Sequence, residues 1–487
     1  MADENIQRTL RRGTAWVGVA SGLSGVLDVV STLACLWLWV SYDELGIATI
    51  AIALFPVLDR IAQLGLGQAA VRSADAGPRE LSSIWWLNVA AACALLAVSF
   101  VAAPAIGAAF GHAIVGSLVC AYAAKLLLQT TQLIPEATLR RELAFDTLSK
   151  LKIFAFLAET TAKLTTAYLG GHGHPDLRIW CFVVGPIAST IVMTIGTQIL
   201  RPWRPQLVFD RAAATAAAKF GIQLSLAEML YFAYTSADYL VIGWVFGTTA
   251  VGVYRVAYEL VLDVVRLVSM ITAEVAFPAF ARLAGDRDAV GKQLVELTRQ
   301  NLMLVAPLLV VIGVAAGDLL PIIFPPPYAV TAAQILCIVG ALRIVSFVLP
   351  AMLAGLGHSR DVLVYNAIAA VVCPAAFALA ATVWGDAGYV SVAWAWAASY
   401  PIPFVVLVWL ALQRTGVSLR TFARGLAPVV GWAVATTAAT IAAHAALPDD
   451  KWLRAIAVAV VTLASYGAFW WNRRRTSLAV DRPPAAV

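Results

Sequence analysis

Residues 42–72 read YDELGIATIAIALFPVLDRIAQLGLGQAAVR, an apolar stretch that follows polar residues and ends on an arginine. Its part from 45 to 71 can cross a hydrocarbon layer of ~30 Å as a helix that rises ~1.5 Å per residue. The chain as a whole is 61% hydrophobic and only 13% charged. That composition favours a membrane-spanning helix here over a buried helix of a soluble domain.

Stretches of the same kind recur along the whole chain. We count fourteen, at 14–40, 45–71, 81–103, 113–133, 151–170, 179–200, 217–246, 250–280, 299–323, 329–354, 362–384, 388–412, 424–446 and 452–471. The segments between them are too short to form an extramembrane domain, and the sequence has neither a GxxxxGK[ST] nor an HExxH motif. It predicts an all-α polytopic membrane protein of about 14 transmembrane helices that is not an enzyme and uses no cofactor or metal.

The basic residues alternate with these stretches. Of the 34 Lys and Arg, 25 fall in segments on one side, 6 fall inside spans, and 3 fall on the other side, namely Arg178, Lys451 and Arg454. Because basic loops are retained in the cytoplasm, both termini are predicted to be cytoplasmic in a bacterial cytoplasmic (inner) membrane. The net charge of +6 is therefore a topology signal, and no nucleic-acid partner is predicted.

An internal repeat is visible when 42–66 is aligned with 248–272. The matched positions include Gly46 with Gly252, Leu54 with Leu260 and Arg60 with Arg266. Chance matching of apolar residues is the alternative. The repeat predicts two six-helix bundles related by pseudo-twofold symmetry. The expected domains are an N-terminal bundle at 1–200, a basic cytoplasmic linker at 201–216, a C-terminal bundle at 217–412, and two additional helices with a basic tail at 413–487.

Charged residues inside the spans are the candidate functional groups, because each costs about 2.5–3.5 kcal/mol to insert. They include Asp28, Asp59, Arg60, Lys125, Glu159, Lys163, Glu228, Asp238 and Arg343, and the run Arg255, Glu259, Asp263 and Arg266, whose spacing predicts one helical stripe. One interpretation is a polar cavity whose basic residues receive an anionic substrate, with carboxylates that carry protons. The other is a set of structural ion pairs, such as Arg255 with Glu259 and Glu159 with Lys163.

Several motifs resemble one known family. QLGLGQAAVR at 63–72 is similar to a DLGLxxAxVR pattern, with Gln63 in place of the common aspartate, and LIPEATLRRELAF at 133–145 is similar to PxAxLxRxLxF. SADYLVIGWVFGTTAVGVYRVAYEL at 236–260 resembles the pattern DxLxIGxxxGxxxLGxYxxAxxL. Together they resemble the polysaccharide transporter family, the Wzx-like flippases of the multidrug/oligosaccharidyl-lipid/polysaccharide exporter superfamily.

This resemblance implies a function. Members move undecaprenyl-diphosphate-linked oligosaccharide repeat units from the inner to the outer leaflet by alternating access, for exopolysaccharide, capsule or O-antigen synthesis, beside a polymerase and co-polymerase. The implied substrate-binding residues are Arg60, Arg266, Arg255, Lys125 and Arg343. Ion antiport would power the cycle, with Asp28, Asp59, Glu259 and Asp263 as the implied ion-coupling residues. The implied ligands are the lipid-linked oligosaccharide and membrane lipids.

Two alternatives stay open. A drug/cation antiporter of the same superfamily would favour a cavity with net negative charge, which the arginines at 60 and 266 do not favour. A membrane-embedded polysaccharide polymerase or assembly factor usually carries a large outer loop, and the sequence has no stretch long enough for one.

Overall fold

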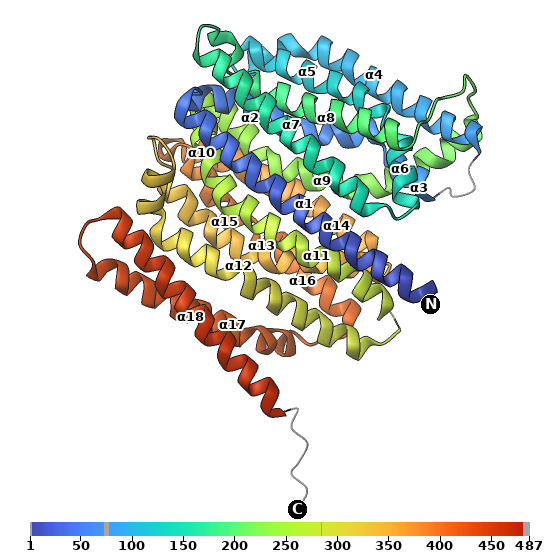
Figure 1. Cartoon of the computed structure of the whole chain (residues 1–487). Coiled ribbons are helices and arrows are strands. Elements are labelled where there is room, and N and C mark those ends of the chain that lie inside the picture. Colours follow the sequence, from blue (N-terminus) through green and yellow to red (C-terminus); the bar gives the residue numbers. More distant parts are fainter. Residues whose placement is uncertain (1, 73–76, 284, 481–487) are drawn as a thin grey trace, which may run out of the picture. The chain divides into compact units, whose positions relative to one another are not determined.

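The computed structural model describes residues 2–72, 77–283 and 285–480, and every regular element in these residues is a helix (Figure 1). This confirms the all-α fold class. All fourteen predicted stretches are helical apart from short breaks. Eleven of the described helices are long and apolar enough to cross a membrane, so the count of fourteen spans stays a prediction.

The chain groups into two compact units, Met1–Arg255 with Asn366–Ala395, and Val256–Tyr365 with Trp396–Val487. The predicted domain boundaries rest on the repeat and stay a prediction. Unit 1 contains α1 (Ala2–Leu38), α2 (Tyr42–Gln63), α3 (Leu66–Arg72), α4 (Pro78–Ala109), α5 (Ala113–Thr130), α6 (Leu133–Arg141), α7 (Phe145–Gly171), η1 (Pro175–Leu177), α8 (Cys181–Leu200), α9 (Arg211–Phe246), most of α10 (Thr248–Tyr258) and of α14 (Ser359–Val383), η3 (Gly385–Ala387), and the start of α15 (Val390–Ser399). Unit 2 contains η2 (Glu259–Asp263), α11 (Val264–Arg282), α12 (Arg287–Ile323), α13 (Val330–Gly355), α16 (Pro401–Thr415), α17 (Leu419–Ala446) and α18 (Lys451–Val480).

Side-chain caps fix where several long helices begin. At α2 the Ser41 hydroxyl accepts a hydrogen bond from the Glu44 backbone N–H, and the Glu44 carboxylate accepts one from the Ser41 backbone N–H at 2.7 Å. Asp210 and Asp286 cap α9 and α12 with their carboxylates. Each such cap stabilises a helix by about 1 kcal/mol, because it satisfies backbone donors that have no partner within the helix.

The predicted span 45–71 is not one continuous helix. α2 ends at Gln63, and the next two residues turn in the left-handed region, with φ of 45° at Leu64 and 63° at Gly65. A Cβ atom at Gly221 of α9 would lie within 2.9 Å of the backbone of this turn. The break between α2 and α3 therefore lies where the chain makes close contact with α9. The periodicity of apolar residues gives no sign of such a contact.

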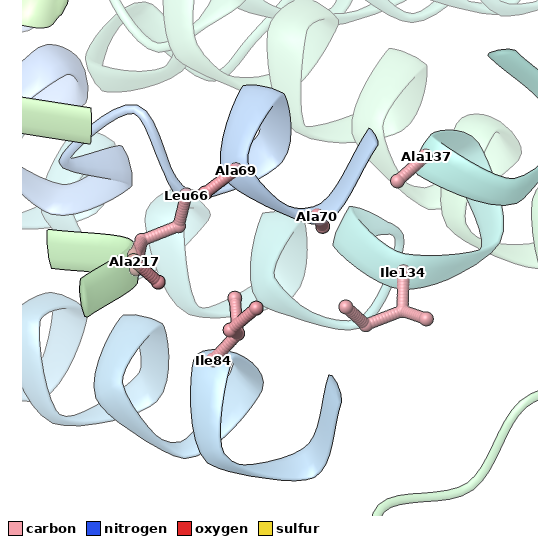
Figure 2. Close-up of a cluster of buried hydrophobic side chains, with 7 residues drawn as sticks. All are labelled: Leu66, Ala69, Ala70, Ile84, Ile134, Ala137 and Ala217. Atoms are coloured by element: carbon pink, nitrogen blue, oxygen red, sulfur yellow. The ribbon is translucent and has the colours of Figure 1, made fainter. Parts of the chain in front are cut away.

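A buried apolar cluster anchors the two short helices α3 and α6 to the longer ones (Figure 2). Its members are Leu66, Ala69 and Ala70 of α3, Ile84 of α4, Ile134 and Ala137 of α6, and Ala217 of α9. Four of these seven side chains are alanine, so the helices approach closely. The cluster therefore holds α3 and α6 against α4 and α9.

Helices α2 and α10 cross at two glycines that the repeat relates. A Cβ at Gly46 would clash with the carbonyl of Thr248 and lie 3.0 Å from the Gly252 nitrogen. A Cβ at Gly252 would clash with the carbonyl of Tyr42 and lie 3.2 Å from the Gly46 nitrogen. Thr248 follows Tyr42 by the same 206 positions that separate the glycines. The contact is thus symmetric, as the predicted pseudo-twofold relation requires.

The predicted stripe of charges at 255–266 is not on one regular α-helix. Glu259–Asp263 forms a π-helix between α10 and α11. A π-helix has more residues per turn, so the 3.6-residue spacing used for the prediction does not continue from Arg255 to Arg266. The regular spacing behind the stripe is therefore interrupted, and the apolar periodicity gives no signal of a π-helix.

In unit 2, α12 packs against α11, α13, α17 and α18. The Asn301 side chain of α12 donates to the Ser269 hydroxyl of α11 at 3.0 Å and to the Ile344 carbonyl of α13 at 2.7 Å. Near the other end of α12, the Asp318 carboxylate lies 2.6 Å from Nε2 of His444 in α17. Polar contacts between apolar helices therefore tie the additional helix α17 to this unit.

Candidate functional site

A cavity of about 380 Å³ lies within unit 1, lined by side chains from α1, α2, α5, α7, α8 and α10. Its charged lining residues are Asp28, Lys125, Glu159, Lys163 and Arg255. Cations outnumber carboxylates three to two in this set, so the lining favours an anionic ligand. These groups come from four spans that are distant in the sequence, and the fold brings them to one place.

Lys163 of α7 is held by α1. Its ammonium donates to the Asp28 carboxylate at 3.0 Å and to the Thr32 hydroxyl at 2.6 Å. The Lys163 side chain is 5% exposed, whereas that of Asp28 is 56% exposed. The partner of Lys163 is therefore Asp28 on another helix and not the neighbouring Glu159 that sequence spacing suggested.

Arg255 of α10 lies beside the same aromatic ring as Lys163. Its Nη1 donates to the Thr49 hydroxyl of α2 at 2.9 Å. The guanidinium carbon is 5.9 Å from the centroid of Phe182, and the Lys163 ammonium is 5.5 Å from that centroid. The ring faces of aromatic side chains attract cations, so Phe182 helps to hold two positive groups close together.

The third cation, Lys125 of α5, contacts another aromatic ring. Its ammonium lies 4.5 Å from the centroid of Phe55, which in turn packs against Tyr122 at 5.0 Å between ring centroids. The Tyr122 hydroxyl donates to the Phe182 backbone carbonyl at 2.6 Å. The aromatic residues thus form a connected wall that positions all three cations.

A second cavity of about 580 Å³ adjoins the first and is lined by α2, α3, α4, α5, α6 and the start of α7. Gln129 and Gln132 line both cavities, so the two are contiguous. Arg60 belongs to this second cavity, where its Nε is 3.2 Å from the Glu228 carboxylate of α9. Its guanidinium also lies 5.6 Å from the centroid of Phe232.

Beside this cavity, the loop after α6 is tied to the segment that precedes α9. The Arg201 guanidinium donates two hydrogen bonds of 2.9 Å to the Glu142 carboxylate and holds the pKa of Glu142 below its usual range. The contribution of this pair to stability is present above the ordinary pKa of a glutamate and is lost as the pH falls through the depressed value. Both side chains are well exposed, so solvent screening keeps that contribution small.

The other predicted site residues lie elsewhere. Asp59 of α2 accepts a hydrogen bond from the Gln63 side chain at 2.7 Å and does not line either cavity. In unit 2, Arg266 forms an ion pair with Asp263 at 3.0 Å, and Glu259 opens the π-helix. The structure therefore brings Asp28, Lys125 and Arg255 together in one cavity and places Arg60 in the adjoining one.

Arg343 of α13 is buried in unit 2, with 3% of its surface exposed. Its guanidinium lies 4.8 Å from the centroid of Trp396 and 5.5 Å from that of Tyr400, and it donates to the Tyr258 hydroxyl at 3.3 Å. These contacts enclose the cation among aromatic side chains, in surroundings unlike those of Lys125.

Most of the lining residues have no site role in the sequence-based prediction, and four of them are instructive, namely Glu159, Lys163, Gln129 and Gln132. Glu159 and Lys163 carried a usable signal, since both are charges inside a span. Gln129 and Gln132 carried almost none, because an amide at the end of an apolar stretch is common at a membrane interface. Their place in both cavities follows from the packing of α5 and α6.

A bundle of apolar helices with charged groups in an internal cavity is typical of a membrane transporter. The chain belongs to the family described as polysaccharide biosynthesis protein, whose family model matches residues 39–333. The predicted resemblance to polysaccharide transporter flippases is thereby confirmed.

Curated relatives with related names cover about two thirds of the chain. The teichuronic acid biosynthesis protein TuaB of Bacillus subtilis is 23% identical over 348 residues, which are 70% of each chain. The lipopolysaccharide biosynthesis protein WzxC of Escherichia coli is 22% identical over 340 residues, 68% of this chain and 67% of WzxC.

Solved structures share the fold. The lipid II flippase MurJ in an inward closed conformation matches with a TM-score of 0.74 at 14% identity, over 95% of this chain and 99% of MurJ. An inward-facing multidrug resistance transporter of the MATE family matches with a TM-score of 0.61 at 14% identity, over 82% of this chain and 99% of that transporter. At these identities the likeness shows the fold alone.

Proposed function

We propose that this protein is a flippase that carries polyprenyl-diphosphate-linked oligosaccharides from the inner to the outer leaflet of a bacterial cytoplasmic membrane. The observation that carries the proposal is the convergence of Lys125, Lys163 and Arg255 on one cavity within a bundle of apolar helices. Moving a bare anion into hydrocarbon costs of order 20 kcal/mol in the idealised limit. Fixed cations that replace water around a diphosphate lower that cost.

The carboxylates give the cavity a second role in this proposal. Asp28 and Glu159 face the same space as the three cations, so a proton on either changes the charge that the diphosphate meets. A membrane potential of 100 mV supplies about 2.3 kcal/mol per charge moved, enough to bias the direction of exchange. Coupling to protons is therefore part of the proposal, as is delivery of the product to a polymerase at the outer leaflet.

The test is leaflet-resolved measurement of lipid-linked repeat units in a strain that lacks the gene. A membrane-impermeant glycosidase digests only units that have reached the outer leaflet. We expect units to accumulate in the inner leaflet, protected from the enzyme, and complementation to release them. Units that reach the outer leaflet but stay unpolymerised would contradict the proposal and indicate an assembly factor.

A drug/cation antiporter is the other candidate, and the same strain tests it. The cationic excess of the cavity disfavours a cationic drug as ligand. We therefore expect unchanged sensitivity to cationic drugs in the deletion strain. Altered sensitivity together with normal distribution of repeat units would replace the flippase proposal with the antiporter.

A further inference from the structure

The larger cavity of unit 1 is rich in side-chain amides. Its sixteen lining residues include five of them, Gln63, Gln68, Asn88, Gln129 and Gln132. A carboxamide presents both a donor and an acceptor, as a sugar hydroxyl does, whereas a charged side chain presents only one kind of group. The volume of about 580 Å³ lies in the range of roughly 300–1,000 Å³ that is usual for ligand sites.

The charges of this cavity are neutralised within the protein. Arg60 pairs with Glu228 at 3.2 Å. Arg140 donates to the Glu136 carboxylate through Nη2 at 2.7 Å and through Nε at 3.1 Å. Each guanidinium that lines the cavity thus has its own carboxylate, that of Glu136 within the lining and that of Glu228 outside it. A ligand held here by the amides is expected to carry no net charge.

Two of the amide oxygens are buried and have no hydrogen-bond partner among the described residues. They are Oε1 of Gln129 and Oε1 of Gln132. An acceptor left in this condition costs about 1–3 kcal/mol, and a ligand hydroxyl removes that cost once the amide rotates to face the cavity. Apolar neighbours such as Leu133 and Phe145 offer surfaces to the C–H faces of a sugar ring.

The position of these two glutamines joins the two cavities. Both side chains line the charged cavity as well as the amide-lined one. In a lipid-linked oligosaccharide the first sugar is bonded directly to the diphosphate, so the two groups need adjoining subsites. Resting on the proposed function, we infer that the amide-lined cavity is a sugar subsite, and that Gln129 and Gln132 bind an uncharged sugar residue while the diphosphate occupies the charged cavity.

Binding of simple sugars to the full-length protein in lipid nanodiscs tests the inference. The probes are methyl glucoside, methyl galactoside and methyl N-acetylglucosaminide, which are uncharged, and methyl glucuronide, which is anionic. Saturation-transfer NMR measures their binding, and phosphorus NMR measures binding of inorganic pyrophosphate. The variants are Gln129→Leu and Gln132→Leu. Gln413→Leu, at an exposed glutamine of unit 2, is the matched control.

We expect at least one uncharged glycoside to bind more tightly than methyl glucuronide. Its affinity should fall about tenfold in each cavity variant, the size expected for loss of a buried hydrogen bond. Gln413→Leu should bind every probe like the unmodified protein. In Gln129→Leu and Gln132→Leu, pyrophosphate binding should fall less than glycoside binding, because these glutamines line both cavities while Lys125, Lys163 and Arg255 line only the charged one. An unchanged melting temperature shows that the variants are folded.

Three results would overturn the inference. They are binding of no glycoside, preference for methyl glucuronide, and glycoside binding that does not change in Gln129→Leu and Gln132→Leu. Each of them leaves the proposed function standing if the leaflet assay shows translocation. Failure of translocation in that assay overturns the proposed function and this inference with it, whatever the glycosides do.

Discussion

Lys163 is the residue at which a structural role and a role in substrate binding can best be tested against each other. It is nearly fully buried, its ammonium donates to Asp28 and Thr32, and its side chain lines the charged cavity. We expect Lys163→Gln to lower transport about 10- to 100-fold, because a hydrogen bond to a charged group contributes about 1.5–3 kcal/mol. Leaflet-resolved export at matched protein abundance is the measurement.

The double variant Asp28→Asn with Lys163→Gln is the control for this prediction. It removes both charges of the pair and leaves no unpaired carboxylate behind, so it should restore any stability lost in the single variant. Transport should remain low, since the cation is still missing. Recovery of export in the double variant would show that Lys163 serves only to pair with Asp28.

At Arg343 we expect a structural effect. Arg343→Met should lower the free energy of unfolding by about 1–3 kcal/mol, because it removes a buried cation from two aromatic rings and from the Tyr258 hydroxyl. Thermal unfolding of the purified protein measures this. An unchanged melting temperature with lost transport would instead support the substrate-binding role predicted from the sequence.

At the scale of helices, the crossing of α2 and α10 depends on the lack of a side chain at Gly46. We expect Gly46→Ala to destabilise the protein by about 1–3 kcal/mol, since the added methyl group would overlap the Thr248 carbonyl. Gly431→Ala in α17 is the matched control, because a Cβ there has nothing within 4 Å. Equal melting temperatures for the two variants would show that the helices separate without cost.

The sequence predicts the helices well and their interruptions poorly. The apolar residues and basic ends that mark each stretch are local properties of the sequence. The stretches could therefore be predicted, and they are helical. The turn at Leu64 and Gly65 and the π-helix at Glu259–Asp263 are not local in this sense. The first accompanies contact with α9, and neither changes the average hydropathy of its segment.

For the whole molecule, the distribution of Lys and Arg predicts the orientation in the membrane. In a variant without its native cysteines, we expect His174→Cys to react with a membrane-impermeant maleimide in intact cells. Arg204→Cys should react only after the membrane is made permeable. Both positions are exposed and lie in loops that the sequence places on opposite sides. The reverse pattern would invert the predicted topology.

The candidate site shows where prediction from a single sequence ends. Asp28, Lys125 and Arg255 could be singled out, because a charge inside an apolar span is costly and therefore marks a candidate functional residue. Which charges meet could not be predicted. The partner of Lys163 lies 135 residues away, and the glutamines that join the two cavities acquire their place only when α5 packs against α2 and α6 packs against α3.

The hydrogen bond between Arg255 and Thr49 has a consequence for the ancestry of the chain. The two residues are separated by the same 206 positions as the glycines that meet at the crossing of α2 and α10. In a symmetric dimer of a single half, a residue this near the axis would face its own copy, giving two threonines or two arginines. An arginine that donates to a threonine across the axis requires two halves with different sequences, and such halves must be encoded separately. Gene fusion would therefore have allowed this protein to replace a symmetric contact with a directional one.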